Sequence, residues 1–310
     1  MIVLWILLGL VTTVFLIAFG CFLKVFYSPK RKISDEIEFP EGKEYEPFYE
    51  QLAAWVRRAR ATPYREVSIK TFDGLILRGK FYEYQKGAPI ELMIHGYRGT
   101  AERDLSGGIF RAFELGHSVL TFDHRGSGAS DGHVITFGVK ESRDCKDWLR
   151  YIVENIDKDA KIFLTGVSMG AATVMLMSRD ELPANVVGVL ADCGYTSAKD
   201  MIQDIMRRMK LPVSLLYPFV VLGGLIFGGF NVGDATPVEA VKESRLPILF
   251  FHGEADGFVP HEMSLANYEA CTAEKRLVIV VGAGHGLCYP VDPEGYLAAM
   301  REFLEPHLVK

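Results

Sequence analysis

A serine lies at the centre of the pentapeptide Gly166 to Gly170, with a glycine two positions away on either side. An apolar run ends at Thr165 and a helical pattern begins at Ala171, so the pentapeptide joins a strand to a helix through a sharp turn. Glycines are needed at such a turn because a larger side chain would collide with the neighbouring strand and helix. We therefore predict that Ser168 is an exposed nucleophile, although the same pentapeptide also occurs in ordinary strand-to-helix turns.

A serine hydroxyl is a weak nucleophile and needs a base. Of the eight histidines, His285 lies in a glycine-rich loop directly after the last apolar run, and we predict that it is this base. For the others a structural or surface role is the commoner one. His95 and His252 each precede a glycine at a strand end, where we expect them to hold loop backbone by hydrogen bonds.

The base needs a carboxylate that fixes its tautomer and stabilises the imidazolium. Asp256 follows the apolar run that begins at Ile248, and it is our choice for this acid. Glu254 lies earlier on the same turn and is expected to be solvated, whereas Asp192, at the end of another run, is the competing candidate. The choice of Asp256 gives the chain order serine, acid, histidine.

Negative charge that develops on a substrate oxygen requires N–H donors placed in advance. One donor is expected from the residue after the nucleophile, Met169, and the other from the loop after an earlier strand. That loop contains Gly96 and Gly99, which let its backbone turn toward a substrate, and its donor would be Tyr97. The alternative interpretation of this loop is a plain turn at the end of a strand.

These residues must be held by a mostly parallel sheet with helices on both faces, since short apolar runs alternate with helical stretches. A hairpin is predicted first, from Arg65 to Lys70 and Leu75 to Tyr84, and the runs that follow are Ile90 to Ile94, Ser118 to Phe122, Ile162 to Thr165, Val186 to Ala191, Ile248 to Phe251 and Leu277 to Val281. Helices are predicted at Lys140 to Asn155, Ala171 to Arg179, Glu262 to Thr272 and Pro293 to Leu304, and a short amphipathic helix that packs on the surface is predicted around Trp55.

The first 23 residues carry no charged side chain, and a helix of that length is long enough to span a bilayer. A cleaved signal peptide would begin with basic residues, whereas here Lys24, Lys30, Arg31 and Lys32 follow the apolar run, so we expect a retained anchor. Basic flanks tend to stay in the cytoplasm, which predicts a catalytic domain on the cytoplasmic side. Lipid modification at Cys21 is the alternative.

Four parts are therefore expected: a transmembrane anchor at 1–27, a solvated linker and packing helix at 28–62, the catalytic domain at 63–310, and a cap inserted into it at 198–245. Residues Leu211 to Phe230 of the cap are apolar enough to suggest a second span, but that would separate Ser168 from Asp256 across the membrane. We expect instead that the cap lines an acyl pocket, dips into the membrane interface, or merely packs on the core.

The net charge of -5 shows no electrostatic footprint for nucleic acid, and the five scattered cysteines suggest neither a disulfide framework nor a metal site.

The motifs together resemble the α/β-hydrolase superfamily: they are His95 to Gly99, Asp123 to Gly128, Gly166 to Gly170, His252 to Pro260 and Gly284-His285. More narrowly, the stretches Asp192 to Ser197 and Asp234 to Ala240 resemble those of bacterial membrane-anchored hydrolases related to the Bem46 and ABHD thirteen-type proteins.

The resemblance implies the same triad of Ser168, Asp256 and His285, no cofactor, and a structural role near the site for Asp123, Arg125 and Gly126. The expected function is hydrolysis of acyl esters, esterase-like or lipase-like, on a small-molecule or lipid-derived substrate. A serine peptidase or a thioesterase of the same fold is the alternative, and a membrane-tethered binding protein without turnover comes from a different class.

Overall fold

A computed structural model describes residues 1–30 and 35–308. Within these ranges the chain forms one sheet of eight strands in the order β1-β2-β4-β3-β5-β6-β7-β8. The strands are β1 (Arg65–Lys70), β2 (Ile76–Tyr82), β3 (Ile90–Ile94), β4 (Ser118–Phe122), β5 (Ile162–Val167), β6 (Val186–Asp192), β7 (Ile248–Gly253) and β8 (Lys275–Val280). Strand β2 pairs antiparallel with both β1 and β4, and all other pairs are parallel, so the predicted hairpin and parallel sheet are confirmed.

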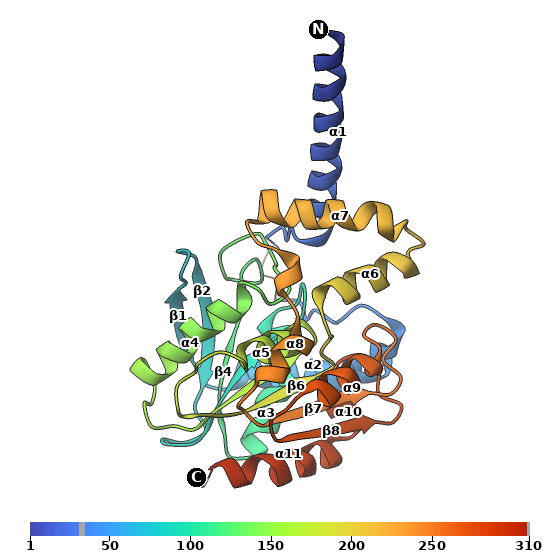
Figure 1. Ribbon diagram of the computed structural model, residues 1–310. Coiled ribbons are helices and arrows are strands. Elements are labelled where there is room, and N and C mark those ends of the chain that lie inside the picture. The colour runs from blue at the N-terminus through green and yellow to red at the C-terminus, as the bar shows by residue number, and fades with distance from the viewer. Residues whose placement is uncertain (31–34, 309–310) are drawn as a thin grey trace.

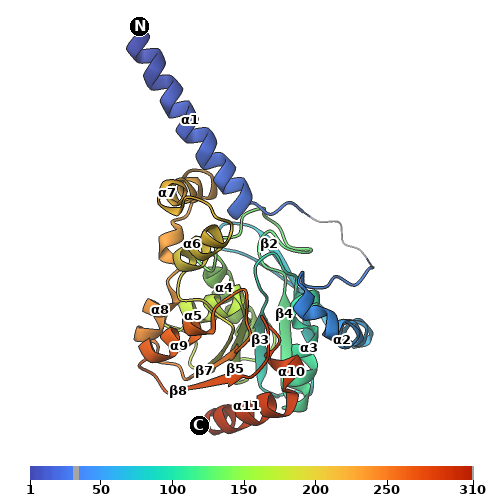
Figure 2. The same cartoon turned by 90° about the vertical axis from the view of Figure 1, so that its right-hand side faces the viewer.

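Helices cover both faces of the sheet, as the alternating pattern predicts. They are α1 (Ile2–Val25), α2 (Tyr49–Ala61), α3 (Ala101–Glu114), α4 (Glu141–Asn155), α5 (Met169–Met177), α6 (Ala198–Arg208), α7 (Val213–Gly223), α8 (Pro237–Ala240), α9 (His261–Ala270), α10 (Cys288–Val291) and α11 (Pro293–Leu308). Figure 2 shows α4, α5 and α9 on one side of the sheet and α2 and α3 on the other. Neighbouring residues of β3 point to opposite faces, since Leu92 packs in the core cluster with Trp148 of α4 and Met93 packs with Ile109 of α3.

Helix α3 is absent from the predicted helices. Its sequence contains Gly107 and Gly108, and two adjacent glycines in a helix interior argue against a helix. The structure gives the reason for Gly107, because a Cβ there would lie 2.5 Å from a ring carbon of Trp55 on α2. The glycine that weakens the helical pattern is thus what allows the predicted surface helix α2 to pack closely on α3.

Helix α1 is the one helix in the described ranges that is long and apolar enough to cross a membrane. It projects from the rest of the molecule (Figure 1). Most of its side chains are exposed. Its last turns are different, because Ala18 and Phe22 are buried against the cap, and Phe26 just beyond the helix is fully buried. The end of the predicted anchor, at residue 27, therefore packs against the rest of the protein.

The segment predicted as a solvated linker is also partly packed. Tyr27 pairs with Val134 and Ser28 is buried, whereas Asp35, where the description resumes, is exposed. Residues 31–34, which include the predicted flanking charges Arg31 and Lys32, lie outside the described residues.

The cap between β6 and β7 is built from α6, α7, a π-turn at Gly224–Gly228 and α8. Helix α7 has 11 residues, too few to span a bilayer, which agrees with the expectation of a single span. It crosses the foot of α1 (Figure 1). Gly223 permits this approach, since a Cβ there would lie 2.6 Å from the carbonyl oxygen of Ala18.

Candidate active site

Ser168 lies between the end of β5 and the start of α5, with φ 58° and ψ -117°. A non-glycine residue rarely adopts this conformation, and it places the side chain at the outer edge of a sharp turn. Both glycines of the pentapeptide are required by contact. A Cβ on Gly166 would lie 2.2 Å from the carbonyl of Gly170, and a Cβ on Gly170 would lie 2.0 Å from the carbonyl oxygen of Ile94.

Three elements bring the predicted serine, histidine and acid together. Ser168 follows β5, Asp256 follows β7 and His285 follows β8, so all three lie at the carboxyl ends of parallel strands. His285 Nε2 lies 2.9 Å from Ser168 Oγ, and His285 Nδ1 lies 2.7 Å from Asp256 Oδ2. This geometry allows Nδ1–H to donate to the carboxylate while Nε2 accepts the serine proton.

The carboxylate of Asp256 is held by four donors. Its Oδ1 accepts the backbone N–H groups of Phe258 and Val259, both at 2.8 Å, and its Oδ2 accepts from His285 and, at 3.1 Å, from Nε2 of His252. Burial alone would raise the pKa of Asp256, but the hydrogen bonds from His252 and His285 outweigh it and hold the pKa well below the ordinary value. The carboxylate is therefore ionised throughout the neutral range.

The competing acid, Asp192, occupies a different place. It is buried at the end of β6 and accepts a hydrogen bond from Tyr296 at 3.1 Å, and in the described structure its carboxylate does not bond to His285. Burial raises its pKa, although contacts from Cys288 and His252 oppose the rise. Of the two candidates, Asp256 is the one that reaches the histidine.

The loop after β3 lies beside the serine. A Cβ built on Gly96 would lie 3.4 Å from Cβ of Ser168, which puts the backbone of Gly96, the residue before Tyr97, against the predicted nucleophile. Asp104 of α3 accepts the N–H of Gly96 at 3.1 Å, and the lack of a side chain on Gly99 leaves room for its carboxylate. The sequence reasoning did not find Asp104, because it did not find the helix that carries it.

Two other predicted roles are met by contacts in the same region. His95 bonds through Nδ1 to the carbonyl of Gly96 at 2.8 Å and accepts the N–H of His124 at Nε2, so it holds loop backbone as expected. Burial lowers the pKa of His95 to about 4 and that of His124 to about 3, which keeps both rings neutral. His252 likewise contacts a loop carbonyl, that of Val259, at 2.9 Å.

Tyr45 is a further residue that sequence reasoning missed. It lies in a short 3-10 helix (Lys43–Phe48), far from the triad in sequence, and its hydroxyl donates to the carbonyl of His285 at 2.9 Å. Burial raises its pKa far above the ordinary value, so the hydroxyl stays protonated as a donor. In the sequence, its only distinguishing feature is an aromatic side chain between two glutamates, Glu44 and Glu46.

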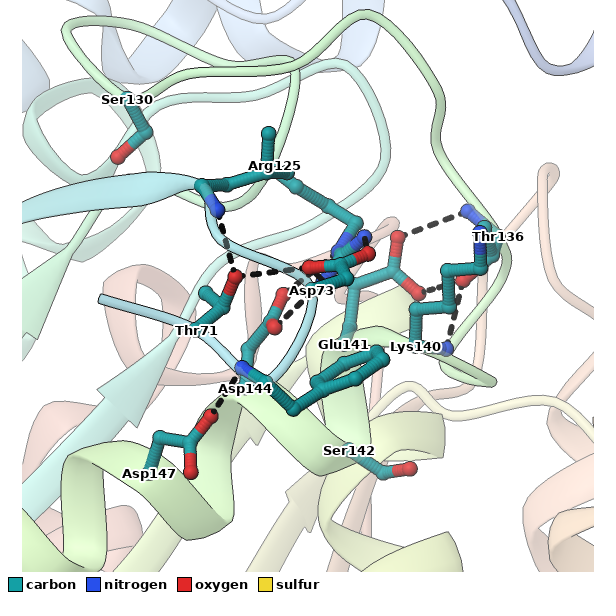
Figure 3. A network of polar contacts seen from close by, with 12 residues as sticks. Thr71, Asp73, Arg125, Ser130, Thr136, Lys140, Glu141, Ser142, Asp144 and Asp147 are labelled. Carbon is teal, nitrogen blue, oxygen red and sulfur yellow. Dashed lines mark hydrogen bonds and ion pairs between the residues drawn. The ribbon is translucent and has the colours of Figure 1, made fainter. Parts of the chain in front are cut away.

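Arg125, in the motif from Asp123 to Gly128, belongs to a network of ion pairs and hydrogen bonds near the site. Arg125 donates to both oxygens of Asp144 at 2.7 and 2.6 Å and also binds Asp73, as Figure 3 shows. In the same figure Glu141 accepts from the backbone of Thr136, and this fixes the loop that carries Phe137. The ring of Phe137 packs 5.1 Å from that of Tyr97, so the network reaches the loop beside Ser168.

Strained backbone gathers at this site. Of the five described non-glycine residues with positive φ, one is Ser168 itself, Cys193 lies beside Asp256 and His285, and Arg98 belongs to the loop after β3. Such strain is maintained only where the surroundings over-determine it, and it is commonest at functional sites. The buried thiol of Cys193 lies within 4.8 Å of a carboxylate oxygen of Asp256 and a ring nitrogen of His285, but because these two residues already bond to each other we assign no metal to this group.

A cavity of about 730 Å³ lies beside β2 and α3, and its lining also includes Ser28 to Lys30, Glu36 and Glu38. Its lining includes Arg98 to Ala101 and excludes Ser168, Asp256 and His285. It does not open on the nucleophile.

Solved structures share the fold of this chain. The Pyrococcus furiosus esterase PF2001 superposes with a TM-score of 0.67 and 24% identity, covering 91% of this chain and 98% of that one. An alpha/beta hydrolase, GrgF from a Penicillium species, superposes with a TM-score of 0.63 and 21% identity over 80% of this chain and all of that one. The chain has the α/β-hydrolase fold.

Sequence relatives agree with this fold. A family model described as serine aminopeptidase, S33, matches residues 90–222. YqkD of Bacillus subtilis is 25% identical over 193 residues, which span 62% of this chain and 63% of YqkD, so the match leaves more than a third of that relative uncovered. Bem46 of Schizosaccharomyces pombe is 25% identical over 220 residues, 69% of this chain and 67% of Bem46, which confirms the predicted resemblance. These comparisons support a hydrolase.

Proposed function

We propose that this α/β-hydrolase is a serine hydrolase that cleaves carboxylic esters through an acyl-enzyme intermediate. The observation that carries the proposal is the chain of contacts from Ser168 Oγ to His285 Nε2 at 2.9 Å and from His285 Nδ1 to Asp256 Oδ2 at 2.7 Å. The strained turn at Ser168 supports it, because such strain is retained where chemistry requires it.

In the proposed mechanism Ser168 Oγ attacks the ester carbonyl while His285 Nε2 takes its proton. The carboxylate of Asp256 stabilises the imidazolium, and the N–H groups of Tyr97 and Met169 bind the oxyanion. His285 then gives the proton to the alcohol that leaves. Water, deprotonated by the same nitrogen, attacks the acyl-serine and releases the carboxylic acid.

An apolar acyl group is the substrate feature that the surroundings favour. Tyr97 and Met169 belong to a hydrophobic cluster that also contains Phe137, residues of the cap, and Phe22 and Phe26 from the end of α1. A relative named thiohydrolase AneE, from Aspergillus aculeatus, is 26% identical over 226 residues, so a thioester is the second candidate substrate. The same triad could attack either bond.

The first test uses the full-length protein in detergent micelles, because deleting the anchor would remove the buried Phe22 and Phe26. Turnover of p-nitrophenyl esters from acetate to palmitate is compared with that of matched acyl thioesters and aminoacyl anilides, for the protein and for Ser168→Ala. Ester turnover that Ser168→Ala abolishes supports the proposal. If only thioesters or only anilides are turned over, the protein is a thioesterase or a peptidase and the ester proposal is wrong. If Ser168 also fails to react with a fluorophosphonate, the protein is a binding protein without turnover.

We also propose that α1 anchors the protein in a membrane and that the cap touches the membrane surface. Leu215 on α7, and Leu225 and Ile226 on the π-turn, are about half exposed or more. Helix α7, which carries Leu215, crosses the foot of α1 (Figure 1), and the π-turn follows it directly in the chain. A helix across the foot of a transmembrane helix lies in the plane of the interface, where apolar side chains enter the acyl region. The substrate would then be a lipid-derived ester that reaches Ser168 from the bilayer.

The double variant Leu225→Asp, Ile226→Asp tests this contact in liposomes. It should lower turnover of a bilayer-dissolved diacyl ester at least tenfold and leave turnover of soluble p-nitrophenyl butyrate unchanged. Leu265→Asp, at a residue of α9 with similar exposure, is the matched control. Equal turnover of the bilayer ester by all three proteins would contradict the proposed contact.

For orientation we propose a cytoplasmic catalytic domain, on the basis of the lysines that follow the apolar part of α1, Lys24 and Lys30. A carboxyl-terminal fusion to alkaline phosphatase, which is active only outside the cytoplasm, should be inactive in a bacterial host. An active fusion would reverse the orientation.

A further inference from the structure

The end of α1 makes direct hydrogen bonds with the loop beside the nucleophile. The hydroxyl of Tyr97 donates to the carbonyl of Val25 at 2.6 Å. One guanidinium nitrogen of Arg98, Nη2, donates to the carbonyl of Lys24 at 2.9 Å and to that of Tyr27 at 3.0 Å. Residues more than 70 positions apart in the chain are thus joined by three bonds.

Helix chemistry explains why these bonds form. The last carbonyls of a helix have no partner within it, and the helix dipole places partial negative charge there. Lys24 and Val25 are the last two residues of α1. A guanidinium is well suited to that end, so Arg98 caps the anchor helix with a charge-assisted bond.

Packing adds a second connection between the same two segments. The ring of Tyr97 lies 5.1 Å from that of Phe137, which lies 5.9 Å from the ring of Phe26, just past the end of α1. All three rings belong to one hydrophobic cluster with Met169. Both proposed oxyanion donors are therefore carried by residues that pack in the same cluster as the end of the anchor.

Backbone strain makes the loop dependent on such contacts. Arg98 has φ 52°, a left-handed conformation that disfavours a residue with a long side chain. Without external contacts a loop of this kind relaxes, and the N–H of Tyr97, one residue earlier, would change direction. Two sets of contacts hold the conformation of this loop. The carbonyls of Lys24, Val25 and Tyr27 accept bonds from its side chains, and Asp104 accepts the N–H of Gly96.

We propose that the end of α1 sets the geometry of the oxyanion loop, with the side chains of Tyr97 and Arg98 as its positioning groups. The inference rests on the proposed function, since it assigns a role in that same reaction. It makes the membrane anchor a working part of the catalytic domain. A displacement of α1 relative to the domain would change the rate of acyl transfer even on a soluble ester.

The test compares Tyr97→Phe, Arg98→Met and the double variant with the unmodified full-length protein in detergent. The matched control is Arg60→Met, because Arg60 also ties the N-terminal segment to the domain, through the carbonyl of Asp35 at 2.6 Å and the carboxylate of Glu102 on α3, but away from the loop. The readouts are kcat and KM on p-nitrophenyl butyrate, the rate of fluorophosphonate labelling, and amide hydrogen exchange of peptides that contain residues 95–100.

Misplacement of an oxyanion donor acts on the transition state, so we expect kcat to fall about tenfold in the double variant with KM within twofold. Exchange in the loop should rise, and Arg98→Lys should recover part of kcat because an ammonium reaches one carbonyl. Arg60→Met should keep kcat. Unchanged kcat and exchange in the double variant would overturn the inference alone, as would an equal loss in Arg60→Met. An unmodified protein without esterase activity or Ser168 labelling would overturn the function and the inference with it.

Discussion

Replacing Asp256 by asparagine changes one atom of the site and tests the proposed roles of the whole triad. Oδ1 of Asp256 accepts two backbone N–H groups, from Phe258 and Val259, and Oδ2 faces two imidazoles, of His285 and His252. The amide oxygen of an asparagine is required at the Oδ1 position, so its NH2 group must occupy the position of Oδ2.

An NH2 group at that position points a donor at His285 Nδ1. The imidazole must then accept at Nδ1 and carry its proton on Nε2, where it faces Ser168 and cannot take the serine proton. His252 worsens the fit, because its Nε2 also contacts the carbonyl of Val259, an acceptor only, and is therefore itself a donor. In the opposite orientation the NH2 group would lie at the Oδ1 position, and the hydrogen bonds from the N–H groups of Phe258 and Val259 would be lost.

The wrong tautomer costs about 10⁴-fold in kcat where the same substitution removes the acid of a serine protease triad, which corresponds to about 5 kcal/mol of transition-state stabilisation. We expect a loss of that order for Asp256→Asn, measured as kcat on p-nitrophenyl butyrate with the full-length protein. Fluorophosphonate labelling should slow in parallel, and the thermal unfolding midpoint distinguishes lost chemistry from lost folding.

Asp192→Asn is the matched control, since it also changes a buried carboxylate at a strand end into an amide. Asp192 bonds to Tyr296 and, in the described structure, not to His285, so kcat should stay within about threefold. The reasoning is refuted if Asp256→Asn keeps more than a tenth of kcat, or if Asp192→Asn loses more than Asp256→Asn.

Three further predictions concern stability. Gly170→Ala should destabilise the fold by about 3 kcal/mol in urea denaturation, because the new Cβ would lie 2.0 Å from the carbonyl oxygen of Ile94; a loss below 1 kcal/mol would mean that the turn can relax. Phe26→Ala should cost 3–5 kcal/mol, since this fully buried ring belongs to the domain core and not to an exposed linker; an unchanged unfolding midpoint would contradict that assignment. Burial lowers the pKa of His95 to about 4 and of His124 to about 3, against about 6.5 in the unfolded chain, so the unfolded state binds more protons between these values. Stability should therefore be complete above pH 6.5 and fall as the pH drops toward 4; a flat profile in that range, measured by urea denaturation at each pH, would show that these histidines are not buried neutral.

Local sequence patterns were enough to predict the sheet and to select three residues, Ser168, Asp256 and His285, that the structure brings into contact. Both depend on short-range patterns: apolar runs mark buried parallel strands, and Ser168, Asp256 and His285 each directly follow one of them. Because the carboxyl ends of parallel strands meet at one edge of a sheet, chain order and strand position are enough to bring these side chains together. The glycines around Ser168 mark the turn because no other residue fits there.

What the sequence could not determine is held by contacts between distant segments. Helix α3 was missed because Gly107 and Gly108 contradict helical propensity locally, and packing against Trp55 and Met93 overrides it. Asp104, which accepts the N–H of Gly96, was missed for the same reason, because it lies on α3.

The same limit applies to the N-terminal residues. Composition shows that the first two dozen residues are apolar, and this pattern is the same for a free anchor and for one that packs on the domain. The folded chain distinguishes the two cases, because Phe26 is buried in the core and Tyr97 and Arg98 bind the end of α1. Tyr45 reaches His285 from 240 positions away, and a bond over that separation leaves no periodicity in the chain, because it depends on where the fold brings two loops together.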